Sequence, residues 1–336
     1  MDSLSATSPA PRDLLVWQHA LACLRAGVPV TLLLVARSTG GSPGRQGFKM
    51  SVAAGSMTGS IGGGIMEHKF VELARDRMKR GETAVLLREQ IHRSEAPFDR
   101  SGMICSGQQT LLLLPLLPCH IPAVHTAVEL LEQHEAGTMH LSHTGELSVH
   151  LGRTGRAMNL EITDEAAGRW HYSEALGFRD RLTIVGGGHV ALALSRIMAT
   201  LDFHLTVFDD RPGLNTLLIN PYVHEKRSLS YDKLAAEVPE GPNQYAVIMT
   251  FGYRSDDVAV RQLLDHDLAY LGLMGSEAKV ARLLDGLRTD GYSEQQLHRL
   301  YTPIGLPIHS RTPEEIAISV AAEIIRVRNA PFGDAR

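Results

Sequence analysis

A glycine-rich turn between an apolar strand and a helix constrains the fold of this chain more than any other feature. Residues Gly186–Ala191 match the pattern G-x-G-x-x-A, in which the first glycine permits a tight turn and the second lets a phosphate approach the backbone. The apolar run Leu182–Val185 precedes the turn. A second run ends in Asp209, roughly 20 residues later, a spacing at which a carboxylate can bind a ribose. We therefore predict that Leu182–Asp210 opens a Rossmann-type domain.

Strands and helices continue to alternate up to the C-terminus. Strands are expected at residues 182–185, 205–208, 245–249 and 270–273, and helices at 189–200, 258–264, 277–286 and 313–328. Alternation of elements of this length predicts a parallel, doubly wound sheet over residues 179–336.

Ligands of such sheets bind at the carboxyl ends of the strands, where phosphates meet helix N-termini. The residues at these positions are candidates for cofactor binding: Gly186, Gly188, His189, Asp209, Gly275 and Ser276. Two alternatives stay open. The domain could keep its glycine turn and bind a ligand other than a dinucleotide, and turn residues need no ligand to account for them.

The first half of the chain has a different pattern, which predicts a separate α+β domain at residues 13–120. Helices are expected at 14–26 and 65–79, strands at 30–36, 48–52, 83–89 and 110–114, and loops at 38–47 and 101–109. Residues 121–178 combine a helix with two hairpin-like segments and are expected to connect the two domains. Residues 1–12 are rich in Ser, Ala and Pro and predict a disordered tail.

A second glycine cluster lies in the N-terminal domain. Gly62, Gly63 and Gly64 end the segment Gly59–Gly64, and Glu67 follows in the first turn of the expected helix. Successive amides without side chains can form an anion-binding nest, so these residues are candidates for cofactor binding. A crowded helix–sheet junction that requires small residues is the alternative.

Cys105 is the third candidate, because small residues flank it in an expected loop. A thiolate is a soft metal ligand, so Cys105 is the candidate metal ligand as well as a cofactor contact. A small buried side chain is the alternative for any single cysteine. The three cysteines form no C-x-x-C pair and the sixteen histidines form no H-E-x-x-H pattern, which argues against a structural zinc site.

Composition excludes several classes of protein. The net charge of −4 gives no basic footprint for nucleic acid. The N-terminus lacks a secretory signal, and the apolar runs are too short to span a bilayer. We expect a cytoplasmic protein that binds neither nucleic acid nor membrane.

Several blocks of this sequence resemble the XdhC/CoxI family, the accessory proteins of xanthine dehydrogenase and related molybdenum hydroxylases. The blocks occur in the family's order and cover nearly the whole chain: Gly41–Arg45, Gly47–Met50, Gly59–Glu67, Cys105–Gly107, Val185–Ala191, Asp209–Pro212, Tyr270–Ser276, Pro303–Leu306 and Thr312–Ala317. Three segments differ from the family's usual sequence, at residues 43–45, 105–107 and 250–254.

The resemblance implies a maturation chaperone rather than an enzyme. Such a protein binds the molybdenum cofactor, protects it while a cysteine desulfurase installs the terminal sulfur, and delivers it to the apo-enzyme. The resemblance implies that Cys105 lies near the molybdenum. It also implies that the glycine turns bind the phosphate of molybdopterin, in its mono- or dinucleotide form. A homodimer is a further expectation that no residue pattern demonstrates.

Two other functions remain open from the residues. An NAD(P)-dependent oxidoreductase would use the glycine turn and Asp209, although the chain lacks an evident set of residues for hydride transfer. A pure interaction protein could use the same fold as a scaffold.

Overall fold

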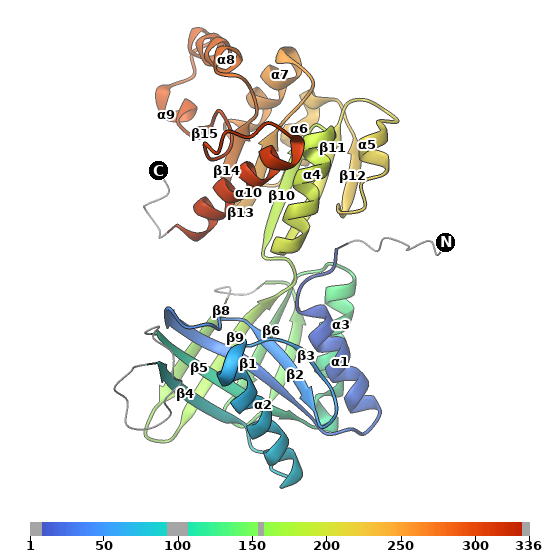
Figure 1. The fold of residues 1–336 in the computed structure, drawn as a ribbon, viewed down its shortest axis with the longest axis vertical. Helices are drawn as coiled ribbons and strands as arrows, with labels where there is room; N and C mark the ends of the chain where they lie inside the picture. The colour runs from blue at the N-terminus through green and yellow to red at the C-terminus, as the bar shows by residue number, and fades with distance from the viewer. Residues whose placement is uncertain (1–8, 93–106, 154–157, 331–336) are drawn as a thin grey trace. The chain divides into compact units, whose positions relative to one another are not determined.

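The computed structural model describes residues 9–92, 107–153 and 158–330 (Figure 1). The chain divides into two compact units, one of residues 10–177 and one that begins at Phe178 and includes Pro9. No helix in the described ranges is long and apolar enough to cross a membrane.

A five-stranded antiparallel sheet organises the first unit, in the order β3-β2-β1-β5-β4. Its strands are β1 (Val30–Gly40), β2 (Lys49–Ala53), β3 (Met57–Gly59), β4 (Leu86–His92) and β5 (Gly107–Leu116). The helix α2 (Gly64–Lys79) packs on one face of this sheet through Met66, Phe70 and Ala74. Both central strands are almost completely buried over their apolar stretches, as a sheet covered on two faces requires.

The central strands are longer than we predicted. Pairing between β1 and β5 continues through polar residues, from Ser38 opposite Gln109 to Gly40 opposite Gly107. The prediction of loops at 38–47 and 101–109 is therefore wrong for residues 38–40 and 107–109, which belong to strands. Backbone pairing does not require apolar side chains, so these polar residues gave no sign of it. A bulge between Val35 and Arg37 accommodates the change of pattern.

A four-stranded antiparallel sheet completes the first unit, in the order β7-β6-β9-β8. Its strands are β6 (Gly137–Ser142), β7 (Leu147–Leu151), β8 (Met158–Asp164) and β9 (Arg169–Leu176). The helices α1 (Leu14–Arg25) and α3 (Ile121–Glu132) share one apolar core with both sheets, with Trp17 and Tyr172 fully buried in it. A buried ion-pair network also lies in this unit, where the ammonium of Lys49 contacts Asp13 at 2.6 Å and Glu174 at 2.5 Å.

The second unit contains a six-stranded sheet in which every pair is parallel, in the order β12-β11-β10-β13-β14-β15. The strands are β10 (Asp180–Val185), β11 (Phe203–Asp209), β12 (Glu225–Ser228), β13 (Gly241–Ile248), β14 (Leu268–Leu273) and β15 (Leu300–Tyr301). The helices α4 (His189–Met198) and α10 (Pro313–Asn329) cover one face, and α7 (Tyr253–Leu263) and α8 (Glu277–Thr289) cover the other. This confirms the Rossmann-type, doubly wound prediction.

The elements that we did not predict are short and peripheral. They include the strands β3, β12 and β15, and the helices α5 (Asn215–Leu218), α6 (Leu234–Glu237) and α9 (Glu294–Leu297). Elements of two to four residues offer too few positions for an apolar period to show.

Candidate functional site

A cavity of about 470 Å³ lies at the carboxyl edge of the parallel sheet. The first turn of α4 forms one wall, Arg211 and Thr216 a second, and the residues that follow β13 and β14 a third. The chain order of the strands reverses between β10 and β13, and ligands of doubly wound sheets bind at such a switch point. The volume falls within the range of small-molecule sites.

The first and third glycines of the turn have different roles. Gly186 has φ +105°, and a Cβ there would lie 2.5 Å from the carbonyl oxygen of Met249, so the turn can meet the end of β13 only without a side chain. Gly188 has φ −72°, and a Cβ there would have no atom within 4 Å. Gly186 therefore serves the fold, whereas Gly188 leaves room in the cavity. His189, the exposed first residue of α4, also lines it.

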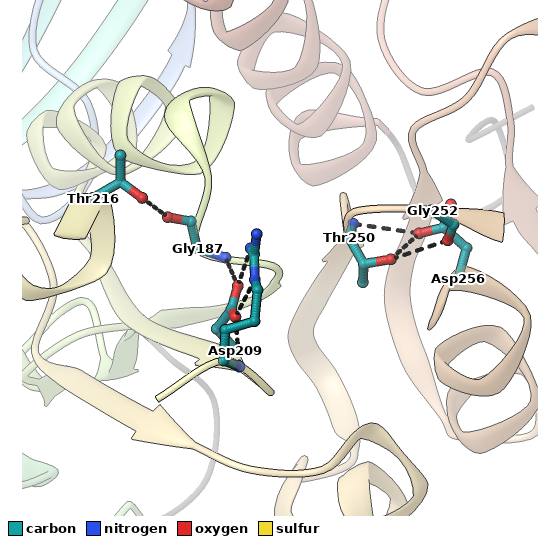
Figure 2. Close-up of polar contacts among 7 residues, drawn as sticks. Gly187, Asp209, Thr216, Thr250, Gly252 and Asp256 are labelled. Atoms are coloured by element: carbon teal, nitrogen blue, oxygen red, sulfur yellow. Dashed lines mark hydrogen bonds and ion pairs between the residues drawn. The ribbon is translucent and has the colours of Figure 1, made fainter. Parts of the chain in front are cut away.

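Asp209 does not extend into the cavity as a free carboxylate. It is fully buried, and its two oxygens accept four hydrogen bonds: from the amides of Gly187 (2.7 Å) and Arg211 (2.9 Å), and from Nε (2.9 Å) and Nη2 (2.7 Å) of Arg211 (Figure 2). Burial raises the pKa of Asp209, but the hydrogen bonds from Arg211 and Gly187 outweigh it and hold the pKa below the usual range. Ribose binding by Asp209 stays a prediction.

Further polar contacts hold the cavity wall in place. Thr216 donates its hydroxyl to the carbonyl of Gly187 at 2.5 Å, so the backbone of Gly187 is held at both its amide and its carbonyl (Figure 2). At the end of β13, Thr250 donates its hydroxyl to the buried carboxylate of Asp256 at 2.5 Å, and Lys279 pairs with the other oxygen of Asp256. We did not single out Thr216, Asp256 or Lys279 from the sequence, because only the tertiary fold brings them to the strand ends.

Gly275 and Ser276 lie at the same edge of the sheet but outside the lining of the cavity, which includes Met274. The hydroxyl of Ser276 accepts a hydrogen bond from the amide of Lys279 at 3.4 Å and so caps α8. A Cβ on Gly275 would contact the side chains of Lys279 and Val280 at 3.4 Å. Both residues serve the start of α8, and their cofactor role stays a prediction.

In the first unit, the folded chain brings together three segments of the N-terminal motif. A Cβ on Gly44 would overlap the carbonyl of Ile61, one on Gly62 would overlap the amide of Gly44, and one on Gly107 would overlap the amide of Ser42. The loop at 41–45, the turn at 59–64 and the start of β5 therefore pack backbone against backbone, and this packing requires glycine.

Glu67 occupies the amides that we predicted as an anion nest. Its Oε2 accepts the hydroxyl of Ser60 (2.6 Å) and the amides of Ile61 (2.9 Å) and Gly63 (3.0 Å). Burial raises the pKa of Glu67, but these bonds outweigh it and lower the pKa. The nest thus holds a carboxylate of the chain itself. Gly64, at φ +70°, begins α2.

Cys105 lies outside the described residues. In the described ranges, no group of three or more His, Cys, Asp or Glu side chains could hold a metal ion. Two cysteines are described there: Cys23 is buried and Cys119 is exposed, and both are free thiols. The metal role of Cys105 stays a prediction.

Comparison with known proteins bears on the whole chain. The family model described as the XdhC Rossmann domain matches residues 182–324, and that of the XdhC and CoxI family matches residues 23–89. Among relatives, the uncharacterized protein YqeB of Escherichia coli (strain K12) is 27% identical over 307 residues, which are 91% of this chain and 45% of the relative. A probable xanthine dehydrogenase subunit of Bacillus subtilis (strain 168) is 32% identical over 150 residues, which are 45% of this chain and 43% of the relative. Each match thus spans less than half the length of the relative.

A solved structure shares the fold. The crystal structure of a xanthine dehydrogenase from Bacillus halodurans superposes with a TM-score of 0.69 at 22% identity, and the match covers 95% of this chain and 99% of that one. The XdhC and CoxI model matches the N-terminal sequence blocks up to Glu67, and the Rossmann-domain model matches the C-terminal ones. The predicted resemblance is confirmed, and this chain belongs to the XdhC and CoxI family.

Proposed function

We propose that this chain is an accessory protein of a xanthine dehydrogenase-type molybdenum hydroxylase, which binds the molybdenum cofactor, protects it and delivers it to the apo-enzyme. The family and the name of the Bacillus subtilis relative support the link to xanthine dehydrogenase. The observation that carries the binding role is the cavity at the switch point of the family's Rossmann domain.

The residues of this cavity fit a molybdopterin in two respects. At Gly188 the backbone is open to the cavity, and the amides that begin α4 have no acceptor among the described residues, as the first turn of a helix predicts. A phosphate suits such amides. The lining also includes the apolar side chains of Leu214, Met249 and Met274, which suit a flat ring. The cofactor would supply the hydroxylase with its redox-active molybdenum, whereas this chain binds and shields it.

Cys105 and the cysteine desulfurase belong to the same proposal. A thiolate is a soft ligand and suits molybdenum or its sulfur. In sequence, Cys105 is two residues from Gly107, where β5 begins and packs against the loop at 41–45. We place Cys105 at the metal end of the cofactor on the family resemblance alone.

The test is a pterin and molybdenum assay on protein purified from a host with an active cofactor pathway. Wild-type protein should carry both, and Cys105→Ala should carry less molybdenum. Cys119→Ala is the matched control, because Cys119 is an exposed free thiol. Wild-type protein without pterin above background would refute the function. Equal molybdenum in the two variants would refute the role of Cys105.

The NAD(P)-dependent alternative rests on the glycine turn. None of the described contacts favours it, because the carboxylate of Asp209 is already engaged by Gly187 and Arg211. Titration with NADH, followed by its fluorescence, tests it directly, and saturable binding would restore it.

A further inference from the structure

The end of β11 presents hydrogen-bond donors to the cavity where we expected an acceptor. An ionised carboxylate has about four lone-pair sites. The carboxylate of Asp209 accepts four hydrogen bonds within the chain, one from Gly187 and three from Arg211. No acceptor capacity is left for the two hydroxyls of a ribose, so the group that faces the ligand here is Arg211.

Arg211 is held in a defined orientation with part of its guanidinium free. Nε and Nη2 contact the two oxygens of Asp209 as a fork, and this leaves the N–H groups of Nη1 without a hydrogen bond to Asp209. The side chain is 42% exposed and lines the cavity. A guanidinium that is fixed on one edge loses little further freedom when its other edge binds a ligand.

The lining of the cavity presents hydrogen-bond donors and no carboxylate to a ligand. This lining, all within the described residues, includes one arginine and one histidine, His189, and no Asp or Glu. Asp209 is buried behind the turn, and the exposed Asp210 is not part of the lining. Because Asp209 and Arg211 neutralise each other, attraction would come from directed N–H groups rather than from net charge.

We propose that Arg211 recognises a phosphate group of the ligand that binds this cavity. This inference rests on the proposed function only in that the cavity is a ligand site. A guanidinium matches both phosphate and carboxylate. Phosphate is favoured because the lining also contains Gly188, whose open backbone admits a tetrahedral anion beside the amides of α4. The ligand is thus a phosphorylated compound that is recognised through its phosphate group rather than through ribose hydroxyls.

The experiment uses the full chain, purified from a host that makes no molybdopterin, and inorganic pyrophosphate as the probe. Titration calorimetry should show saturable binding, and Arg211→Gln should weaken it about tenfold or more, as expected for hydrogen bonds to a charged group. Arg261→Gln is the matched control, since Nε of Arg261 also donates to both oxygens of a nearby aspartate, Asp257, but Arg261 lies outside the cavity lining. It should bind like wild type.

A second variant keeps the test valid if Arg211→Gln does not fold. Gly188→Asp leaves the pair of Asp209 and Arg211 intact and adds a carboxylate where a side chain meets no atom within 4 Å. It should fold and lose binding, whereas Gly188→Asp that binds pyrophosphate like wild type would overturn the proposal.

Three further results would overturn it: no saturable binding by wild type at millimolar pyrophosphate, equal binding by folded Arg211→Gln, or succinate binding as tight as that of pyrophosphate. Failure of the proposed function is distinguishable. Protein without pterin that still binds pyrophosphate through Arg211 would refute the cofactor role alone. Pterin retention that is indifferent to Arg211 would refute this inference alone.

Discussion

Substitution of two neighbouring glycines by alanine separates fold from binding at the turn before α4. Gly186→Ala forces a side chain to φ +105° and places its Cβ 2.5 Å from the carbonyl oxygen of Met249. The backbone conformation costs about 1–2 kcal/mol and displacing the end of β13 costs about 1–3 kcal/mol. We expect a loss of about 2–5 kcal/mol. Gly188→Ala, at φ −72° in open space, should change stability by no more than about 0.5 kcal/mol.

The two tryptophans allow the loss to be assigned to one unit. Trp17 and Trp170 both lie in the unit of residues 10–177. In urea unfolding, tryptophan fluorescence therefore reports on the first unit, whereas far-UV circular dichroism reports on both. Gly186→Ala should lower the urea midpoint of the second unit, which circular dichroism detects, and should leave the fluorescence transition of the first unit unchanged. Gly188→Ala should shift neither, yet retain less pterin than wild type.

The reasoning fails under either of two results. Equal destabilisation by both substitutions would show that Gly188 has a structural role that its open surroundings do not reveal. Full pterin retention by stable Gly188→Ala would show that the ligand does not approach the backbone there.

Three more predictions concern the polar groups behind the two glycine turns and the buried network. Lys49→Met should destabilise the first unit by about 3–5 kcal/mol, measured by fluorescence in urea, because Glu174 then stays buried without its cation. The pKa of Glu67 is lower in the folded chain than in the unfolded chain, where it is about 4.3. The ionised side chain therefore stabilises the fold above this unfolded pKa, and this stabilisation is lost as the pH falls through the folded pKa. Wild type should lose more stability below pH 5 than Glu67→Gln does. Thr250→Val should cost the second unit about 1–3 kcal/mol by circular dichroism, because Asp256 loses a donor in a buried site, and Thr250→Ser should restore it.

The sequence was sufficient for the elements that repeat a clear pattern. The alternation after Leu182 predicted the parallel sheet because each buried strand and amphipathic helix is long enough to show its period. The polar ends of β1 and β5 could not be predicted in this way, since Ser38 and Gln109 pair through their backbones. Strands such as β12, with four residues at the edge of the sheet, carry no apolar signal.

The candidate site was predictable in position but not in the direction of its side chains. Asp209 occurs at the end of β11, as its spacing from the turn indicated. The sequence does not tell whether its carboxylate faces a ligand or the turn, because that depends on Arg211 two residues later and on the amide of Gly187. A cation so close to the acidic residue was the one signal that could have suggested an internal pair.

The two glycine turns differ in what a ligand would have to displace. At the first, Glu67 accepts the amides of Ile61 and Gly63, so an entering anion must break these hydrogen bonds and expel a carboxylate. At the second, the only amide of the turn that Asp209 binds is that of Gly187, and the backbone at Gly188 stays open to the cavity. An anion therefore binds the second turn at a lower cost in free energy. We therefore expect a phosphate to bind at the turn of the Rossmann unit, whereas the first turn has a structural role for as long as Glu67 stays in place.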